Sequence, residues 1–227
     1  YFEILAYDET PLGPLQLRRR ELLREPGTIV TEVSLNHEFL MSSYHTASER
    51  ALAWRALELH PGQGLDVLVG GLGLGYTARE ALVSQRVARV TVVEFLPQVI
   101  AWLDRDLVPL AGELKADARL KVVQGDVYRR LAQAPAVLHD LILLDVDHSP
   151  EDRLAAANGA FYTEAGLLSA KRHLKAGGVL GVWSYTESSP FAEALRRSFH
   201  EVRVVPVVFR NASVGETQTD WLFFARP

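Results

Sequence analysis

Five short apolar segments alternate with helical patterns from residue 65 onward, and this alternation limits the folds open to the chain. Uninterrupted apolarity predicts strands that are buried on both faces, as in a parallel sheet covered by helices. The segments cover residues 65–69, 90–93, 120–123, 141–144 and 179–183. Helices are predicted near 75–86, 97–107, 127–133, 163–175 and 190–199. The chain is therefore predicted to be an α/β protein with a mostly parallel sheet and helices on both faces.

The two ends of the chain have a different pattern. Residues 1–45 alternate extended runs with turn-forming residues, which predicts a small N-terminal β meander. Residues 46–227 form the predicted α/β domain, and its last two runs, 202–209 and 221–225, predict a C-terminal antiparallel hairpin. Thr46 and Glu49 have the spacing of a capping box, which predicts a helix start at the junction.

Composition excludes several classes of function. The 227 residues carry a formal net charge of −4, which disfavours a general nucleic-acid binder. The chain has no cysteine, so disulfides and thiolate chemistry are excluded. No apolar run approaches the roughly 18 residues of a membrane helix, and no histidine pair has metal-binding spacing. We therefore expect a cytoplasmic protein that binds no membrane and no metal.

A glycine-rich turn is the strongest local signal. The segment 66–76 (DVLVGGLGLGY) places Gly70, Gly71, Gly73 and Gly75 between a predicted strand and a predicted helix. Glycines let the backbone approach a ligand, and the helix N-terminus offers free N–H groups. A dinucleotide fingerprint requires a small residue where Tyr76 stands. The spacing instead fits the G-x-G-x-G turn of S-adenosylmethionine-dependent methyltransferases.

Two acidic residues follow the next two strands. Glu94 ends the segment 90–94, where a carboxylate can accept hydrogen bonds from both ribose hydroxyls. Asp126 follows the segment 120–124, where it can accept from an adenine amino group while the Val127 N–H faces a ring nitrogen. A simple helix cap is the alternative role for Asp126. Because parallel strands end at one edge of a sheet, these residues and the glycine turn predict a nucleoside pocket.

In this order the motifs resemble those of the spermidine synthase family, the aminopropyltransferases and relatives with the class I methyltransferase fold. The resemblance implies a Rossmann-like sheet, a small N-terminal β region and a homodimer that makes contact through the N-terminal strands. It covers most of the chain. The matching segments are GGLGLG at 70–75, VTVVE at 90–94, GD at 125–126, DLILLD at 140–145, FY at 161–162, KAGG at 175–178 and WLF at 221–223.

The sequence departs from the family pattern where the acceptor would bind. The aspartate that holds the donor's amino group in the family falls on Gly73. The family's Y-H-E reads Ala47, Ser48 and Glu49, and no glutamine stands near Met41. The resemblance therefore implies a retained adenosyl pocket and a changed acceptor side.

Transfer from a sulfonium to an amine predicts a carboxylate near the reacting nitrogen. We expect Asp145, after the fourth strand, to orient and deprotonate the acceptor and also to contact the adenosyl ligand, with Asp147 as its helper. His148, Tyr185 and Glu187 are predicted to line the acceptor side.

Three functions remain open from sequence. The main prediction is an S-adenosylmethionine-dependent methyltransferase acting on a small-molecule acceptor, because Gly73 and the changed acceptor loops depart from the aminopropyltransferase pattern. The alternative is a divergent aminopropyltransferase that uses decarboxylated S-adenosylmethionine and an amine. The third is a non-catalytic nucleoside-binding regulator.

Overall fold

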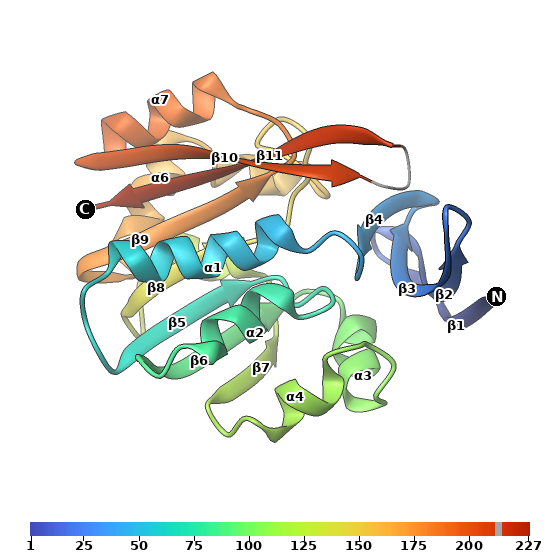
Figure 1. Cartoon of the computed structure of the whole chain (residues 1–227). Helices are drawn as coiled ribbons and strands as arrows, with labels where there is room; N and C mark the ends of the chain where they lie inside the picture. The colour runs from blue at the N-terminus through green and yellow to red at the C-terminus, as the bar shows by residue number, and fades with distance from the viewer. Residues whose placement is uncertain (212–214) are drawn as a thin grey trace.

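The computed structural model describes residues 1–211 and 215–227 and contains two sheets. The smaller sheet is antiparallel, in the order β1-β2-β3-β4 (Phe2–Thr10, Gly13–Leu22, Glu25–Leu35, Glu38–Ser42). Three of these strands are predicted from the sequence, and β4 is not. Figure 1 shows this sheet standing across the ends of the parallel strands of the larger one.

The larger sheet has seven strands in the order β10-β11-β9-β8-β5-β6-β7. Strands β5 to β9 run parallel, and β10 and β11 form the predicted C-terminal antiparallel hairpin, with β11 paired to β9. The bounds are Leu65–Gly70 (β5), Val87–Glu94 (β6), Leu120–Gln124 (β7), His139–Leu144 (β8), Leu174–Ser184 (β9), Glu201–Asn211 (β10) and Glu216–Arg226 (β11). The predicted mostly parallel α/β sheet is confirmed.

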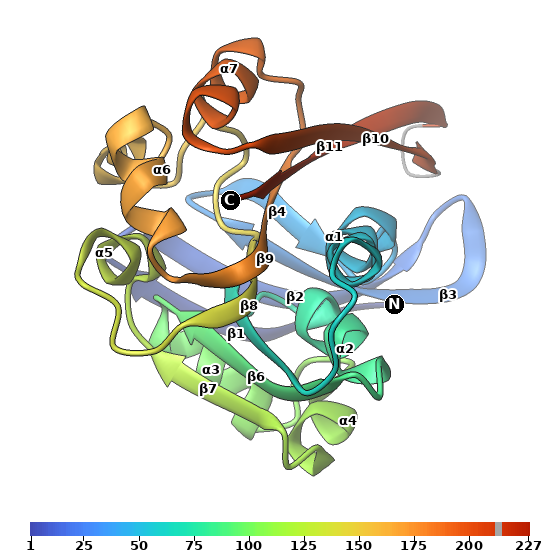
Figure 2. The same ribbon diagram turned by 90° about the vertical axis from the view of Figure 1, so that its left-hand side faces the viewer.

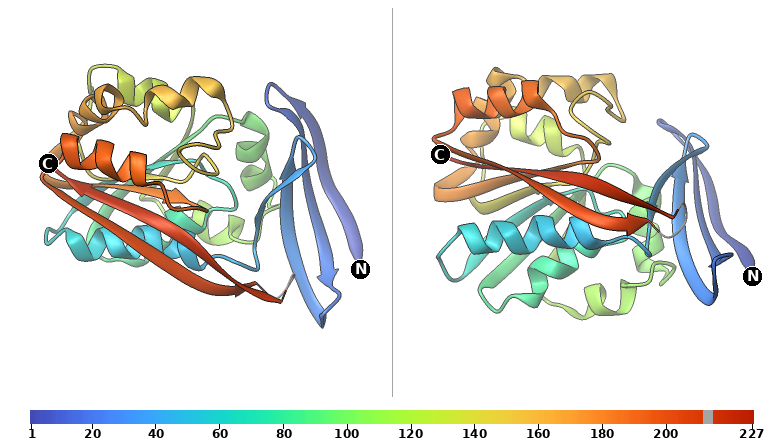
Figure 3. Two further views of the ribbon diagram at one scale, coloured as in Figure 1. Left: turned by 90° about the horizontal axis from the view of Figure 1, so that it is seen from above. Right: turned by 45° about the horizontal axis from the view of Figure 1, so that its top comes forward.

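Helices cover both faces of this sheet, because side chains alternate between the faces along each buried strand. Leu141 and Leu143 belong to one apolar core, and Ile142 and Leu144 to the other. Figures 2 and 3 show α1 and α2 on one side and α6 and α7 on the other. The helices are α1 (Ala47–Leu59), α2 (Tyr76–Val83), α3 (Pro97–Asp104), α4 (Ala111–Ala116), α5 (Val127–Ala132), η1 (Ala156–Ala160), α6 (Glu164–Lys171) and α7 (Ser189–Ser198). None of the described helices is long and apolar enough to cross a membrane.

Strand order makes the carboxyl ends of β5 and β8 the natural ligand position. The chain runs from β5 outward through β6 and β7, then returns to β8 on the other side of β5. At such a reversal the loops after the two central strands separate and leave a crevice. One apolar core continues from the small sheet into this region, since Leu15 and Leu17 cluster with Leu52 of α1. The small sheet is therefore held over the crevice.

Candidate functional site

A cavity of about 740 Å³ occupies the crevice between the small sheet and the strand ends. Its walls include the glycine turn, the residues that follow β6, β7 and β8, and side chains from α1, β4 and β11. The predicted residues that line it include Gly71, Gly73, Gly75, Glu94, Asp126, Val127, Asp145, Asp147, His148 and Tyr185. The sequence therefore predicts most of one wall of this cavity.

The first bend of the glycine turn, at Gly71, leaves no room for a side chain. Gly71 has φ +90°, and a Cβ there would lie 2.3 Å from the Asp145 carbonyl oxygen. Gly75 has φ +91° and precedes the first residue of α2. The turn thus brings its backbone against the end of β8, next to the cavity, as a nucleoside cradle requires.

Glu94 supports this turn as well as lining the cavity. Its Oε2 accepts from the Leu72 N–H at 2.8 Å, and its Oε1 accepts from the Leu96 N–H at 2.8 Å. Burial raises the pKa of the Glu94 carboxyl, while these backbone donors act against the rise. The backbone N–H groups of Gly73 and Phe95 also lower this pKa, so Glu94 collects donors from the turn and from its own loop.

Asp126 is the N-cap of α5, which is one of its two predicted roles. Its Oδ1 accepts from the Tyr128 N–H at 2.9 Å and from the Arg129 N–H at 3.1 Å. Asp126 and Val127 also line the cavity, so capping fixes the carboxylate in a position facing the predicted adenine site. Capping and ligand binding are compatible here.

Asp145 lies at the end of β8, directly beside the glycine turn. The Asp145 N–H donates to the Gly70 carbonyl at 3.0 Å, and Oδ2 accepts from the Thr77 hydroxyl at 3.1 Å. Burial and the nearby Asp220 raise the pKa of the Asp145 carboxyl to about 6. A carboxylate in this position can contact a ligand on the turn and accept a proton near neutral pH.

Two further carboxylates face the cavity, and sequence reasoning missed both. Glu49 lies in the first turn of α1, and Asp220 lies in β11. Ser48 joins them, because its Oγ is 2.6 Å from Asp220 Oδ2 and 3.2 Å from Glu49 Oε2. The Trp183 indole N–H donates to the same Oγ at 2.9 Å. These contacts link α1, β9 and β11 at one point of the cavity wall.

Burial and the charge of Asp145 raise the pKa of Glu49 to about 8. Burial also raises the pKa of Asp220, against hydrogen bonds from Ser48 and Trp183. The capping box predicted for Glu49 is wrong: the Thr46 side chain makes no cap hydrogen bond, and Glu49 turns to the cavity instead. The sequence signal that could have placed Glu49 in the cavity was its alignment with the glutamate of the family's Y-H-E motif.

Asp147 does not have the environment of a catalytic helper. It is buried, its Oδ1 accepts from the Leu154 N–H and the Asn158 amide, and its Oδ2 accepts from the Tyr162 hydroxyl. Both oxygens are thus engaged in holding the loop after β8. The structure gives Asp147 a loop-anchoring role in place of the predicted one.

The three predicted acceptor-side residues separate into two groups. His148 and Tyr185 line the cavity, and their rings lie 6.4 Å apart with the Tyr185 N–H donating to the His148 carbonyl. The acceptor-side role of Glu187 stays a prediction, because Glu187 is exposed and lies outside the cavity lining. The reason is local: hydrogen bonds between Ser184 and Thr186 turn the chain toward the start of α7.

Curated relatives match parts of the chain. A polyamine aminopropyltransferase 2 from Streptomyces coelicolor is 36% identical over 93 residues, which are 39% of this chain and 17% of that protein. A polyamine aminopropyltransferase from Prochlorococcus marinus is 28% identical over 124 residues, 55% of this chain and 42% of that protein. The matches thus span less than half of each relative. No family model matches the chain.

Solved structures match nearly the whole chain. A spermidine synthase in complex with the transition state analogue AdoDATO superposes with a TM-score of 0.77 at 20% identity, over 98% of this chain and 73% of that one. The chain resembles the spermidine synthase family. The resemblance predicted from the motifs is thereby confirmed.

The spermidine synthase of Thermotoga maritima gives a TM-score of 0.74 at 19% identity, over 98% of this chain and 71% of that one. At these identities the likeness to spermidine synthases concerns the fold. The methyltransferase-like architecture with a small N-terminal sheet is therefore shared with them.

Proposed function

We propose that the protein is a transferase that moves an alkyl group from the sulfonium of an adenosyl donor to a small amine. The observation that carries the proposal is the Asp145 carboxylate, half-buried at the end of β8 beside the glycine turn, where it lines the cavity. Glu94 and Asp126 on the donor side support an adenosine ligand. Glu49 and Asp220 on the other side support an acceptor with positive charge.

Asp145 has the chemistry that an amine acceptor needs. A free alkylamine has a pKa of about 10, so deprotonating it at pH 7 costs about 4 kcal/mol. Asp145 accepts a hydrogen bond and then the proton from the attacking nitrogen, and as an anion it stabilises the positive charge that develops there. The glycine turn, Glu94 and Asp126 meanwhile orient the donor for displacement at its sulfonium carbon.

Aminopropyl transfer from decarboxylated S-adenosylmethionine is our preferred form of the reaction. The curated relatives that match in sequence are named polyamine aminopropyltransferases, which favours this alternative over methyl transfer. Gly73 argues against aminopropyl transfer, because it leaves the turn without a carboxylate for the donor's amino group. The carboxylates of Asp145 and Asp220 supply negative charge elsewhere in the same cavity.

The nucleoside product decides between these forms. Purified protein is incubated with each donor and a panel of mono- and diamines, and the thioether is identified by mass spectrometry. Methylthioadenosine with an aminopropylated amine is the expected result. S-Adenosylhomocysteine would show methyl transfer instead. Binding of a donor without any amine-dependent product, in Asp145→Asn and wild type alike, would support a nucleoside-binding regulator.

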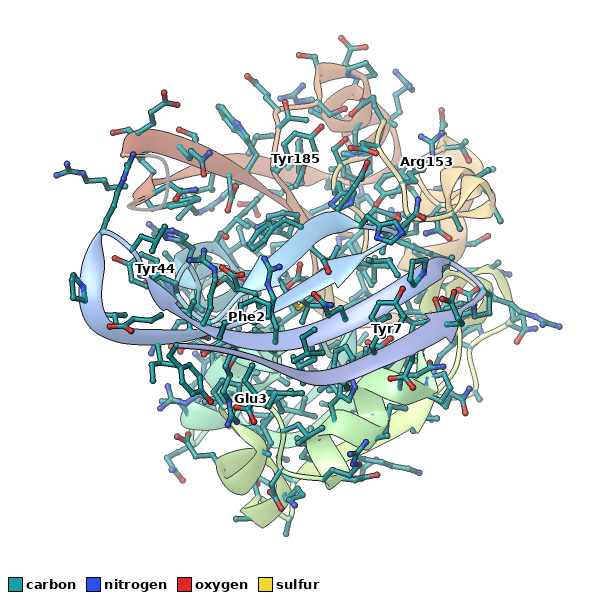
Figure 4. The ribbon with its side chains drawn as sticks, turned by 90° about the vertical axis from the view of Figure 1, so that its right-hand side faces the viewer. Phe2, Glu3, Tyr7, Tyr44, Arg153 and Tyr185 are labelled. Carbon is teal, nitrogen blue, oxygen red and sulfur yellow. The ribbon has the colours of Figure 1, made fainter. Side chains whose placement is uncertain are left out.

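For assembly we propose a homodimer that forms through the small sheet. Phe2 and Tyr7 of β1 are 60% and 54% exposed, and Figure 4 shows both on the outer sheet. Exposed aromatic side chains on a sheet favour association. Light scattering of the purified protein should give about twice the chain mass of 25.2 kDa, and replacing Phe2 and Tyr7 together by serine should reduce it to that value.

A further inference from the structure

Ser48 Oγ has three polar neighbours, and their number restricts where protons lie. The hydroxyl carries one proton and two lone pairs. The Trp183 N–H at 2.9 Å uses one lone pair, and Asp220 Oδ2, at 2.6 Å, is the closest acceptor for the hydroxyl proton. Glu49 Oε2 at 3.2 Å then faces the remaining lone pair. A favourable contact there requires a proton on the Glu49 carboxyl.

We propose that Glu49 is held protonated in the free protein by a hydrogen-bonded chain running from Glu49 through Ser48 to Asp220, and that a cationic acceptor discharges this proton to solvent when it binds. The inference rests on the proposed function and adds a role for two residues outside its donor pocket. Glu49 changes from a neutral donor to a carboxylate that pairs with an ammonium group. Asp220, acting through Ser48, is a positioning residue.

The surroundings of Glu49 favour this arrangement. Three titratable side chains on the elements around α1 interact electrostatically with Glu49. They are Tyr76 of α2, Asp145 after β8 and Asp220 of β11. The pKa of Asp145 is raised to about 6, below the value of about 8 for Glu49, and Asp220 Oδ2 is the closest acceptor for the Ser48 hydroxyl. With Asp145 and Asp220 both ionised, a third negative charge on Glu49 is unfavourable until a cation enters.

The basic side chains nearest to Glu49 in sequence do not supply that cation. Arg50 is exposed and bonds to Glu80 at 3.1 Å. His45 Nε2 is 3.1 Å from Asn211 Oδ1, and burial lowers the pKa of His45. Among the described residues no group of histidines and acids is arranged to hold a metal ion. Arg18 and Arg20 of β2 line the same cavity, but both pair with Glu32, at 2.8 and 2.7 Å. An organic ammonium group is therefore the cation that fits.

Proton release on binding tests the inference directly. Calorimetric titration of 1,4-diaminobutane into the protein loaded with methylthioadenosine, the thioether product that carries no group to transfer, counts the protons released at pH 7 in buffers of different ionisation enthalpy. Glu49→Gln keeps the shape of the neutral side chain and cannot release a proton. Wild type should release about one proton more than this variant. An equal count in the two proteins, or no diamine binding to wild type, overturns the inference.

A second variant isolates Asp220. Asp220→Asn keeps an oxygen acceptor for Ser48 but removes a charge that raises the pKa values of Glu49 and Asp145. The acid limb of the pH–activity profile should move down by about half a pH unit or more. Asp104→Asn, the same change at an exposed site on α3, should leave the profile in place. An unmoved profile in Asp220→Asn contradicts its positioning role, and loss of proton release in Asp220→Asn but not in Glu49→Gln assigns the proton to Asp220 instead.

Failure of the inference is distinguishable from failure of the proposed function. The inference fails when diamine binds and the wild-type and Glu49→Gln proton counts agree, whatever the product analysis gives. The proposed function fails when wild type forms no adenosyl thioether with any amine, whatever the proton count.

Discussion

The Met41 sulfur lies 2.9 Å from the position that a Cβ on Gly73 would occupy. Gly73 also has φ +52°, in the left-handed region. Two residues that depart from the family motifs therefore meet at one point of the cavity. The space that a side chain at position 73 would need is filled by Met41 of β4.

Gly73→Ala tests this relationship. The left-handed backbone and the contact with Met41 both oppose a Cβ, and we expect a loss of about 1–2 kcal/mol in unfolding free energy. Met41→Ala should recover part of that loss, with a coupling energy of about 0.5 kcal/mol in a double-mutant cycle measured by urea unfolding. Strictly additive single changes would show that the methionine does not restrict this position.

Asp145→Asn should reduce turnover with an amine acceptor by about 10²- to 10⁴-fold, because an amide cannot accept the proton from the attacking nitrogen. The amide is nearly isosteric and can still accept from Thr77, so donor affinity should stay within about threefold. Product formation and calorimetric donor binding measure the two effects. Asp104→Asn is the matched control, and a variant with wild-type turnover would remove Asp145 from the mechanism.

Glu94→Gln should weaken donor binding by about tenfold and lower stability by about 1–3 kcal/mol, since one amide nitrogen would face a backbone N–H of Leu72 or Leu96. A thermal shift with each donor compares the variant with wild type. Unchanged donor affinity would show that Glu94 only supports the turn.

Glu49→Gln should stabilise the protein at alkaline pH. The pKa of Glu49 is raised to about 8 in the folded state, so the folded protein binds more protons than the unfolded chain between pH 5 and 8. Stability in wild type therefore falls as pH rises through that range, and the glutamine variant lacks this loss. In urea unfolding, the free energy of unfolding of the variant should exceed that of wild type by about 1–3 kcal/mol at pH 8, and the two should be nearly equal at pH 5. The same advantage at both values would assign the effect to packing.

Sequence reasoning located the wall of the cavity that is proposed to bind the donor, because its acidic residues end or follow parallel strands. Glu94, Asp126 and Asp145 all end or follow parallel strands, and parallel strands deliver their carboxyl ends to one edge. The glycine turn has its own local signature. Positions fixed by short-range pattern and by strand direction are therefore predictable.

The acceptor side depends on contacts that no local pattern contains. Ser48 and Asp220 are 172 residues apart in the chain and meet through the register of β11 against β9. Asp147 looks like a second active-site acid until its three partners from the following loop are known. Glu187 lies outside the cavity lining after the Ser184–Thr186 turn, which no pattern in the sequence predicted.

The single apolar core that joins the small sheet to α1 has a consequence for how this cavity can change. Residues of β2 and β3 that cover it, such as Leu15 and Val33, are packed into that core, so altering them costs folding stability. Gln218 of β11 lines the same cavity but is exposed. Substitutions in the β10–β11 hairpin should therefore change the acceptor preference at a lower cost in stability than substitutions in the small sheet.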